Sequence, residues 1–368
     1  MKVLDKQGTG KLLTKVSSAF YNVLSAESND EMMEISERIS PKLSESSNNI
    51  YLNEKLFARV KAVYEQKDKL HLSTEEAKLL EETYYAFSVR GANLSAEDKA
   101  KYRELSTELS KLTLKFDQNV LKDENRYELL LTSEDQLAGL PQGVIDAAAL
   151  KAKEKGKTGW MFTLSAPSYV PFMRYADNRE LRKELYLANM AVGNKGDEYD
   201  NEENIKNIVN TRLAIARLMG YNSFAEYTLK RRMAQKPEAV YELTDKLLAA
   251  YKPVAVNEYN AVQGFALGME KKNFDIMPWD WSYYSEKLKD VKFNINDEMT
   301  RPYFELKQVQ KGVFGLATQL YGITFKENKN IPVYHPDVNT YEVYDADGKF
   351  LSVLYTDFFP REGKQSGA

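Results

Sequence analysis

The side chains able to do chemistry in this sequence of 368 residues are few, because it holds two histidines and no cysteine. The lack of cysteine excludes thiol catalysis, disulfides and every Cys-based zinc or iron–sulfur site. His71 and His335 lie far apart in the sequence, and a metal site built on both is a minor alternative to two isolated histidines. The sequence contains no G-x-S-x-G elbow, no H-E-x-x-H motif and no dinucleotide-binding fingerprint. The individual residues therefore predict no active site.

Three short patterns have a possible binding function, and each also has a plainer interpretation. Residues Gly8–Lys11 look like part of a phosphate loop, but the full spacing and a preceding strand are missing. Residues Lys230–Arg232 form a small basic patch that fits a solvated helix face. Residues Trp279–Trp281 with Tyr283 and Tyr284 could form an aromatic binding platform, although such residues are usually core or interface anchors.

The charge balance and composition exclude several classes of protein. Lys and Arg number 51 against 54 Asp and Glu, a formal net charge of −3, which argues against a surface dedicated to nucleic acid or anionic lipid. No stretch approaches the roughly 18 consecutive apolar residues that cross a bilayer. The first residues, Met1–Asp5, are charged too early for a secretory signal peptide. The sequence therefore predicts a globular protein with no nucleic-acid or membrane partner.

Long helices are expected for most of the chain, because only 18 glycines and 11 prolines interrupt it. Ser73 with Glu76 forms a capping box that opens one helix. From Ser95 to Val120 apolar residues recur at steps of three and four, which predicts a long amphipathic helix. Further helices are predicted over residues 178–190, 204–219, 237–251 and 307–321, the last ending at Gly322 as a C-cap.

Two regions read as strands. Residues 127–131 and 160–164 bracket an Ala-rich stretch, which suggests a small βαβ unit or a hairpin insertion. Near the end of the chain, residues 341–344 and 350–355 flank an Asp-Gly turn, which predicts a β-hairpin.

Several longer segments, read together, carry a family likeness. They are Arg174–Arg182, Arg217–Tyr221, Met277–Asp280 with the paired tyrosines that follow, Tyr334–Val338, Tyr341–Asp345 and Tyr355–Ala368. In order and spacing, from about residue 40 to the last residue, the chain resembles the thimet oligopeptidase and peptidyl-dipeptidase family of zinc metallopeptidases. Within this family, the sequence resembles the peptidyl-dipeptidase branch more than the oligopeptidase branch.

The resemblance implies a mainly α fold, a neurolysin-like helical ellipsoid of which this chain holds only part. Residues 1–150 are expected to form an N-terminal helical lobe. Residues 151–368 are expected to form the first part of the metallopeptidase domain: helices, then the β-hairpin at about 333–357, with the catalytic half missing.

The resemblance also implies the chemistry of the full-length enzyme. In the family, zinc (Zn) is held by the two histidines of an H-E-x-x-H helix and a glutamate from a following helix, and the glutamate between the histidines activates water. That helix begins some tens of residues beyond the position matching Ala368, so this chain is expected to hold no metal ligand and no catalytic residue. The parent protein would cleave oligopeptides and release C-terminal dipeptides, whereas this chain alone would be inactive.

Four residues are candidates for substrate binding by this resemblance. An edge strand ending at Gly367 and Ala368 would lie along the bound peptide and pair with its backbone; the alternative is a sheet edge that only closes the fold. Arg361 and Lys364 would attract the peptide carboxylate, or would form surface ion pairs. His335 is not assigned to zinc.

A second function class stays open, a non-catalytic helical module that binds peptides or acts as a scaffold. The expected partners are short peptides and the missing catalytic half of the same protein. The cytoplasm is the favoured compartment, with the periplasm open because relatives carry further helical sequence before the position of Met1. Apolar surface left uncovered by a missing half would favour aggregation or a dimer.

Overall fold

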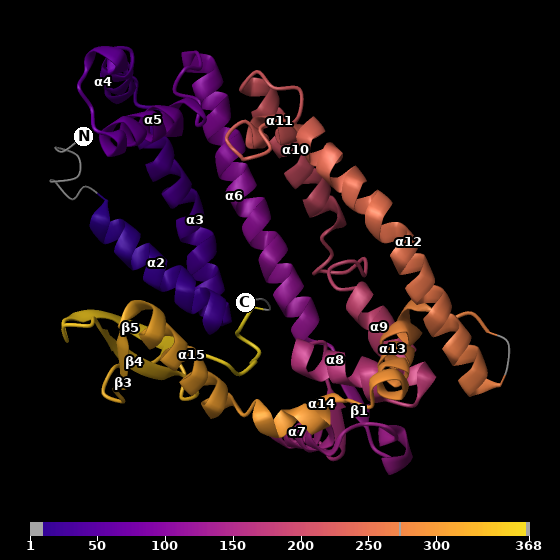
Figure 1. Cartoon of the computed structure of the whole chain (residues 1–368). Coiled ribbons are helices and arrows are strands. Elements are labelled where there is room, and N and C mark those ends of the chain that lie inside the picture. Colours follow the sequence, from indigo (N-terminus) through magenta and orange to yellow (C-terminus); the bar gives the residue numbers. More distant parts are fainter. Residues whose placement is uncertain (1–9, 272–273, 366–368) are drawn as a thin grey trace. The chain divides into compact units, whose positions relative to one another are not determined.

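The computed structural model describes residues 10–271 and 274–365 of the chain. The contacts divide it into two compact units that alternate along the sequence (Figure 1). The first unit takes its described residues from Met1–Asn29, Glu124–Met190 and Glu258–Ala368, and the second consists of Asp30–Asp123 and Ala191–Asn257. The predicted domain boundary near residue 150 stays a prediction.

The second unit is helical. Its elements are α3 (Asp30–Tyr51), α4 (Glu54–Tyr64), the 3-10 helix η1 (Lys67–Lys69), α5 (Thr74–Ser88), most of α6 (Ala96–Asn125), α10 (Glu202–Leu218), α11 (Phe224–Leu229) and the first part of α12 (Pro237–Glu270).

Local sequence signals explain where several of these helices begin. The capping box of α5 is confirmed: the Ser73 hydroxyl accepts from the Glu76 amide at 3.3 Å, and the Glu76 carboxylate accepts from the Ser73 amide at 3.1 Å. Asn53 caps α4 by accepting from the Leu56 amide at 3.0 Å. The predicted long amphipathic helix is α6, and Tyr102 on its buried face packs in a small core with Leu52 and Ile215.

The first unit combines helices with two small sheets. Its elements are α2 (Lys11–Ala26), β1 (Leu129–Leu131), η2 (Glu134–Leu137), α7 (Gln142–Glu154), β2 (Trp160–Phe162), α8 (Ala166–Tyr175), α9 (Arg179–Met190), the last part of α12, α13 (Pro278–Phe293), α14 (Asp297–Thr300), η3 (Arg301–Tyr303), α15 (Leu306–Tyr321), β3 (Thr324–Glu327), β4 (Asn339–Tyr344) and β5 (Phe350–Thr356).

Strands β1 and β2 pair antiparallel, with Leu130 opposite Met161, and α7 lies between them in sequence. The βαβ alternative is therefore wrong, because a βαβ unit joins parallel strands. The connection is long enough for either direction, and the structure pairs the strands antiparallel with Leu131, Met161 and Phe162 buried.

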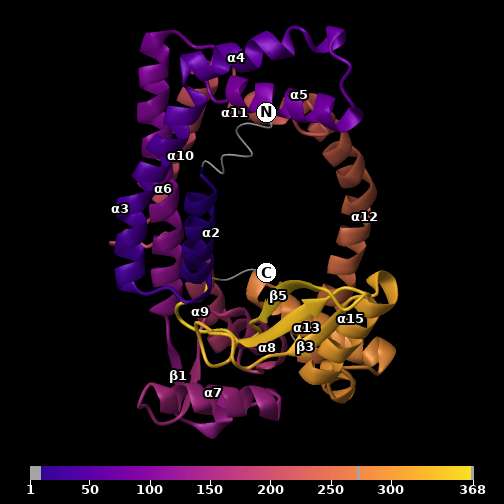
Figure 2. The same ribbon diagram turned by 90° about the vertical axis from the view of Figure 1, so that its left-hand side faces the viewer.

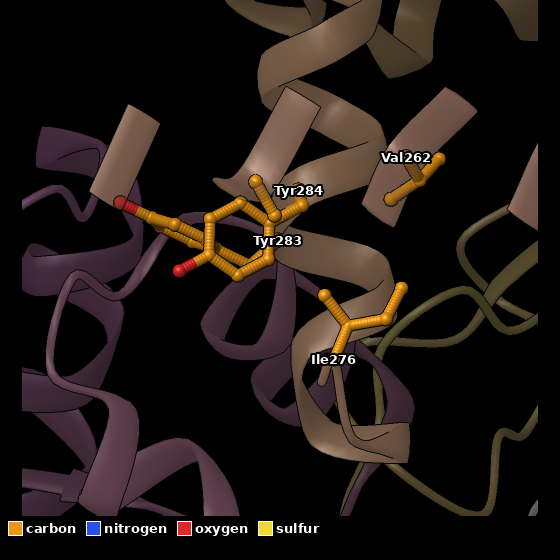
Figure 3. Close-up of a cluster of buried hydrophobic side chains, with 5 residues drawn as sticks. Val262, Ile276, Tyr283 and Tyr284 are labelled. Carbon is orange, nitrogen blue, oxygen red and sulfur yellow. The ribbon is translucent and has the colours of Figure 1, made fainter. Parts of the chain in front are cut away.

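Helix α12 runs to Glu270, well past the predicted end at Tyr251, with Pro253 inside it. The reason is tertiary. Val262 and Ala266, in the extension, are buried in a core with Ile276, Tyr283 and Tyr284 (Figure 3). The free energy gained by this apolar burial offsets the free-energy cost of the backbone hydrogen bond that proline removes.

Strands β3, β4 and β5 form an antiparallel sheet in that order, with α15 beside it (Figure 2). The ring of Phe314 on α15 stacks on Phe325 at 4.1 Å between centroids and meets Tyr341 edge-on at 5.0 Å. The predicted β4–β5 hairpin is confirmed, and its turn needs Gly348 because φ there is +81°. The predicted end of α15 is also confirmed, with Gly322 in the left-handed conformation.

Among the described residues, no helix combines the length and the apolar character that crossing a membrane requires.

Candidate functional site

The segment that follows β5 carries the predicted substrate-binding cations and is tied to the end of α2. The Arg361 guanidinium makes a two-pronged contact with the Asp357 carboxylate, at 2.9 and 2.6 Å, and its Nε also donates to Glu27. Its Nη2 donates to the carbonyl of Ala26, the last residue of α2, at 2.6 Å. Only 11% of the Arg361 side chain is exposed.

Arg361 therefore supplies the positive charge that a helix C-terminus favours. The last turn of α2 contains no basic residue of its own. A cation at that end interacts favourably with the helix dipole and satisfies a carbonyl that has no partner inside the helix.

Lys364 faces the same carboxylate. Its Nζ lies 3.1 Å from an Asp357 carboxylate oxygen and also donates to the backbone carbonyls of Asp357 at 2.8 Å and Phe359 at 3.2 Å. Tyr334 donates its hydroxyl to Asp357 at 3.0 Å. The hydrogen bonds from Arg361, together with those from Lys364 and Tyr334, hold the pKa of Asp357 well below its usual range, although partial burial acts the other way. Asp357 is therefore the anion around which both cations are arranged.

Backbone hydrogen bonds continue this tie on both sides. The Ser28 amide donates to the Gly363 carbonyl at 2.6 Å, and the Gln365 amide donates to the Ser25 carbonyl at 2.9 Å. A Cβ added at Gly363 would lie 2.5 Å from the Ser28 carbonyl oxygen, so only glycine allows this approach. We call residues 357–365 the strap, because they hold α2 within the first unit.

The other two predicted site residues, Gly367 and Ala368, lie outside the described residues. Strand β5 ends at Thr356, and the strap residues that lead toward Gly367 form no strand. The predicted peptide contact of all four residues stays a prediction.

Only part of the aromatic motif around Asp280 lies in the core, since Trp281 is 39% exposed. Tyr283 and Tyr284 are buried, and Asp280 is fully buried between Arg179, at 2.6 Å, and Arg182, at 3.1 Å. Burial alone would raise the pKa of Asp280, but hydrogen bonds from Arg179, the backbone amide that precedes α13 and Arg182 outweigh it and lower that pKa. The core-anchor interpretation is confirmed for the two tyrosines.

The remaining sequence motifs are exposed or paired. His71 is exposed, and the ring of His335 accepts from the Asp337 amide at 3.2 Å. Lys230–Arg232 follow α11 rather than forming a helix face, and Arg231 pairs with Glu82 at 2.6 Å. Gly8 lies outside the described residues, so the phosphate-loop interpretation stays a prediction.

A buried polar network in the second unit was not predicted from the sequence. Asp123, in the last turn of α6, is fully buried and accepts from the Gly193 amide at 2.7 Å and from Lys195 at 2.8 Å. Asn201 receives a hydrogen bond from Asn119 at 3.1 Å. An acidic residue in the last helical turn opposes the helix dipole, and that was the available signal that Asp123 has a partner elsewhere.

In the part of the chain that the structure describes, residues suited to zinc are not grouped. Within residues 10–271 and 274–365 no cluster of three or more His, Cys, Asp or Glu side chains could hold a metal ion. Asp357 and Glu27, two carboxylates beside the predicted site, are both engaged by Arg361, and Glu362 pairs with Lys155. The described residues therefore do not fit a zinc site.

Comparison with known proteins identifies the family. The model of peptidase family M3 matches residues 172–368. The chain is 36% identical over 368 residues to dipeptidyl carboxypeptidase of Escherichia coli K12, which covers all of this chain and 54% of that protein. It is 32% identical over 364 residues to oligopeptidase A of the same organism (97% of this chain, 53% of that protein) and 32% identical over 375 residues to organellar oligopeptidase A of Arabidopsis thaliana (100% and 46%). The chain spans about half the length of the curated relatives it matches. With more than half of its residues matched by the family model, the chain belongs to peptidase family M3.

Proposed function

We propose that this chain is the non-catalytic portion of a zinc-dependent peptidase that cleaves oligopeptides and releases C-terminal dipeptides. The observation that carries the proposal is the family match over residues 172–368 in a sequence without H-E-x-x-H. The preference for dipeptide release is supported by the relative named dipeptidyl carboxypeptidase, which is 36% identical, against 32% for oligopeptidase A.

The chain's contribution to substrate binding is sequence-tolerant backbone pairing. Within the described residues β5 pairs only with β4, which leaves its other edge without a strand. An extended peptide can add to such an edge through main-chain hydrogen bonds. By the family resemblance, Gly367 and Ala368 would also lie along the bound peptide. Arg361 and Lys364 would contact the peptide carboxylate only in exchange for Asp357 or Glu27, so their first role is to position the strap.

Three measurements on the purified 368-residue chain test the proposal. Elemental analysis should find zinc far below one atom per chain, and a quenched oligopeptide substrate should not be hydrolysed. Peptides should nevertheless bind, with affinity that depends little on side-chain identity. Zinc-dependent turnover by the chain alone would contradict the proposal.

The alternative function is a peptide-binding or scaffold module that needs no catalytic partner, and the open edge of β5 supports it equally. Co-expression with the part of the E. coli dipeptidyl carboxypeptidase that this chain does not match separates the two. Restored release of dipeptides favours the peptidase, and peptide binding with no gain in turnover favours the module.

A further inference from the structure

Helix α15 has an exposed apolar stripe that its own sheet does not use. Its residues are Leu306, Val309, Val313, Leu316 and Leu320, spaced alternately by three and four residues, and between 39% and 64% of each is exposed. We call them the outward stripe. This spacing is that of the a and d positions of a heptad, which form a continuous seam along one side of a helix.

The sheet is packed by a different side of α15. Phe314 stacks on Phe325, and Gln310 donates to the Tyr341 hydroxyl at 2.9 Å. Positions 310, 314 and 317 lie about a quarter of a turn around the helix from the outward stripe, at roughly 100° per residue. The contacts with the sheet therefore leave the outward stripe uncovered.

The flank of the stripe away from the sheet carries glycine and glutamine and no charged side chain. Gly312 and Gly315 lie there, and a Cβ added at either would meet nothing within 4 Å. Gln308 and Gln319 lie on the same flank. Glycine inside a helix costs about 0.5–1 kcal/mol relative to alanine, and nothing in the described chain uses the space it leaves. Such a surface suits the close approach of another helix.

The comparisons limit what that helix can be. The M3 family model matches this chain up to residue 368, yet the chain accounts for only 54% of dipeptidyl carboxypeptidase of E. coli. The relatives therefore contain further polypeptide that could cover such a face. A seam with heptad spacing and no charged flank fits a helix that stays permanently packed, rather than a transient partner steered by charge.

We propose that the outward stripe of α15 docks an apolar α-helix from the portion of the M3 peptidase that this chain does not match. The proposal rests on the function proposed above, in that it requires a catalytic polypeptide to act together with this chain. Its partner is a helix with apolar residues at heptad spacing, packed along Val313 and Leu316.

Co-purification tests the docking. The probe is the unmatched part of the E. coli dipeptidyl carboxypeptidase, co-expressed with the tagged full 368-residue chain. The double variant V313A/L316A should retain at least about tenfold less probe than the unmodified chain. Each substitution removes apolar contact, while alanine preserves the helix. The control K307A/K311A changes exposed residues on another side of α15 and should retain the probe as the unmodified chain does.

A second measurement does not depend on how the alanine variant folds. Because the chain has no cysteine, Leu316→Cys introduces its only thiol. A maleimide should modify this thiol in the chain alone and at least tenfold more slowly in the complex. Equal modification rates, failure of the complex to form, or equal retention of the probe by V313A/L316A and the control would overturn the proposal. A disulfide-linked dimer through this thiol in the presence of the probe would also overturn it, because the occupant would then be a second copy.

Turnover of a quenched peptide distinguishes this proposal from the function. A complex that forms through the stripe but lacks activity refutes the function and leaves the docking intact. Activity that is unchanged by V313A/L316A refutes the docking and leaves the function intact.

Discussion

Replacing Arg361 by alanine should release the strap from α2. The side chain donates to Asp357 through both Nη atoms, to Glu27, and to the carbonyl of Ala26, and only 11% of it is exposed. The last turn of α2 has no basic residue that could replace this contact from within the helix.

The cost can be worked out from what remains after the substitution. A hydrogen bond to a charged group contributes about 1.5–3 kcal/mol, and breaking a fully buried ion pair costs about 3–5 kcal/mol. Asp357 keeps Lys364 and Tyr334 as partners, and Glu27, with 34% of its side chain exposed, can be hydrated. The loss should therefore be at the lower end, about 2–3 kcal/mol of local stability.

Hydrogen exchange at two amides measures this loss locally. Ser28 and Gln365 donate the backbone hydrogen bonds that join α2 to the strap. If the substitution lowers the local opening free energy by about 2–3 kcal/mol, their exchange should accelerate by about 30- to 150-fold. The matched control is Lys246→Ala, which removes an exposed i,i+4 pair with Glu242 and should leave both amides unchanged. Exchange in Arg361→Ala within threefold of the unmodified chain would refute the reasoning.

The same substitution should change the response to acid. The folded-state pKa of Asp357 is lowered, so its ionised form stabilises the strap above the unfolded-state pKa of about 3.9, and this stability is lost as pH falls through the lower folded value. Arg361 is the main cause of the lowered pKa. When the pH is lowered from 5 to 2, the alanine variant should therefore lose less protection from hydrogen exchange in the strap than the unmodified chain loses. Parallel pH profiles for the two proteins would contradict this assignment.

Further substitutions test other parts of the chain. Asp280→Asn should destabilise the first unit by about 3 kcal/mol, because it leaves the charge of Arg182, 1% exposed, without its carboxylate; thermal unfolding followed by tyrosine and tryptophan fluorescence would contradict this if the midpoint did not move. Ser73→Ala should destabilise the second unit by about 1 kcal/mol, measured by urea unfolding with Ser73→Gly as the milder comparison, and an equal loss in both variants would contradict the side-chain cap. Gly363→Ala should accelerate exchange at the Ser28 amide, because the new Cβ would displace the Ser28 carbonyl, and unchanged exchange would show that the strap can shift without cost.

The parts of the fold that the sequence predicted are those governed by nearby residues. The capping box at Ser73, the Asp-Gly hairpin and the end of α15 at Gly322 were all predicted, because each depends on contacts within a few positions. The length of α12 was not, because proline at 253 predicts a stop and only the buried contacts of Val262 and Ala266 extend the helix.

The candidate site was predicted less completely. The sequence singled out Arg361 and Lys364, but it held no signal that they share Asp357 or that Glu27, 334 residues away, meets Arg361. Ion pairs between such distant residues depend on how the elements pack, and any of the 54 acidic residues could have been the partner.

By itself, then, the sequence determined the helical class, the starts of several helices such as α5, α6 and α12, and the M3 family likeness, because periodicity, capping and ordered motifs are written in adjacent residues. Only the tertiary structure decided the direction of β1 against β2, the attachment of the strap to α2, and the side of α15 that stays uncovered. Burial and long-range pairing depend on which surfaces meet, and that is settled only when the whole chain packs.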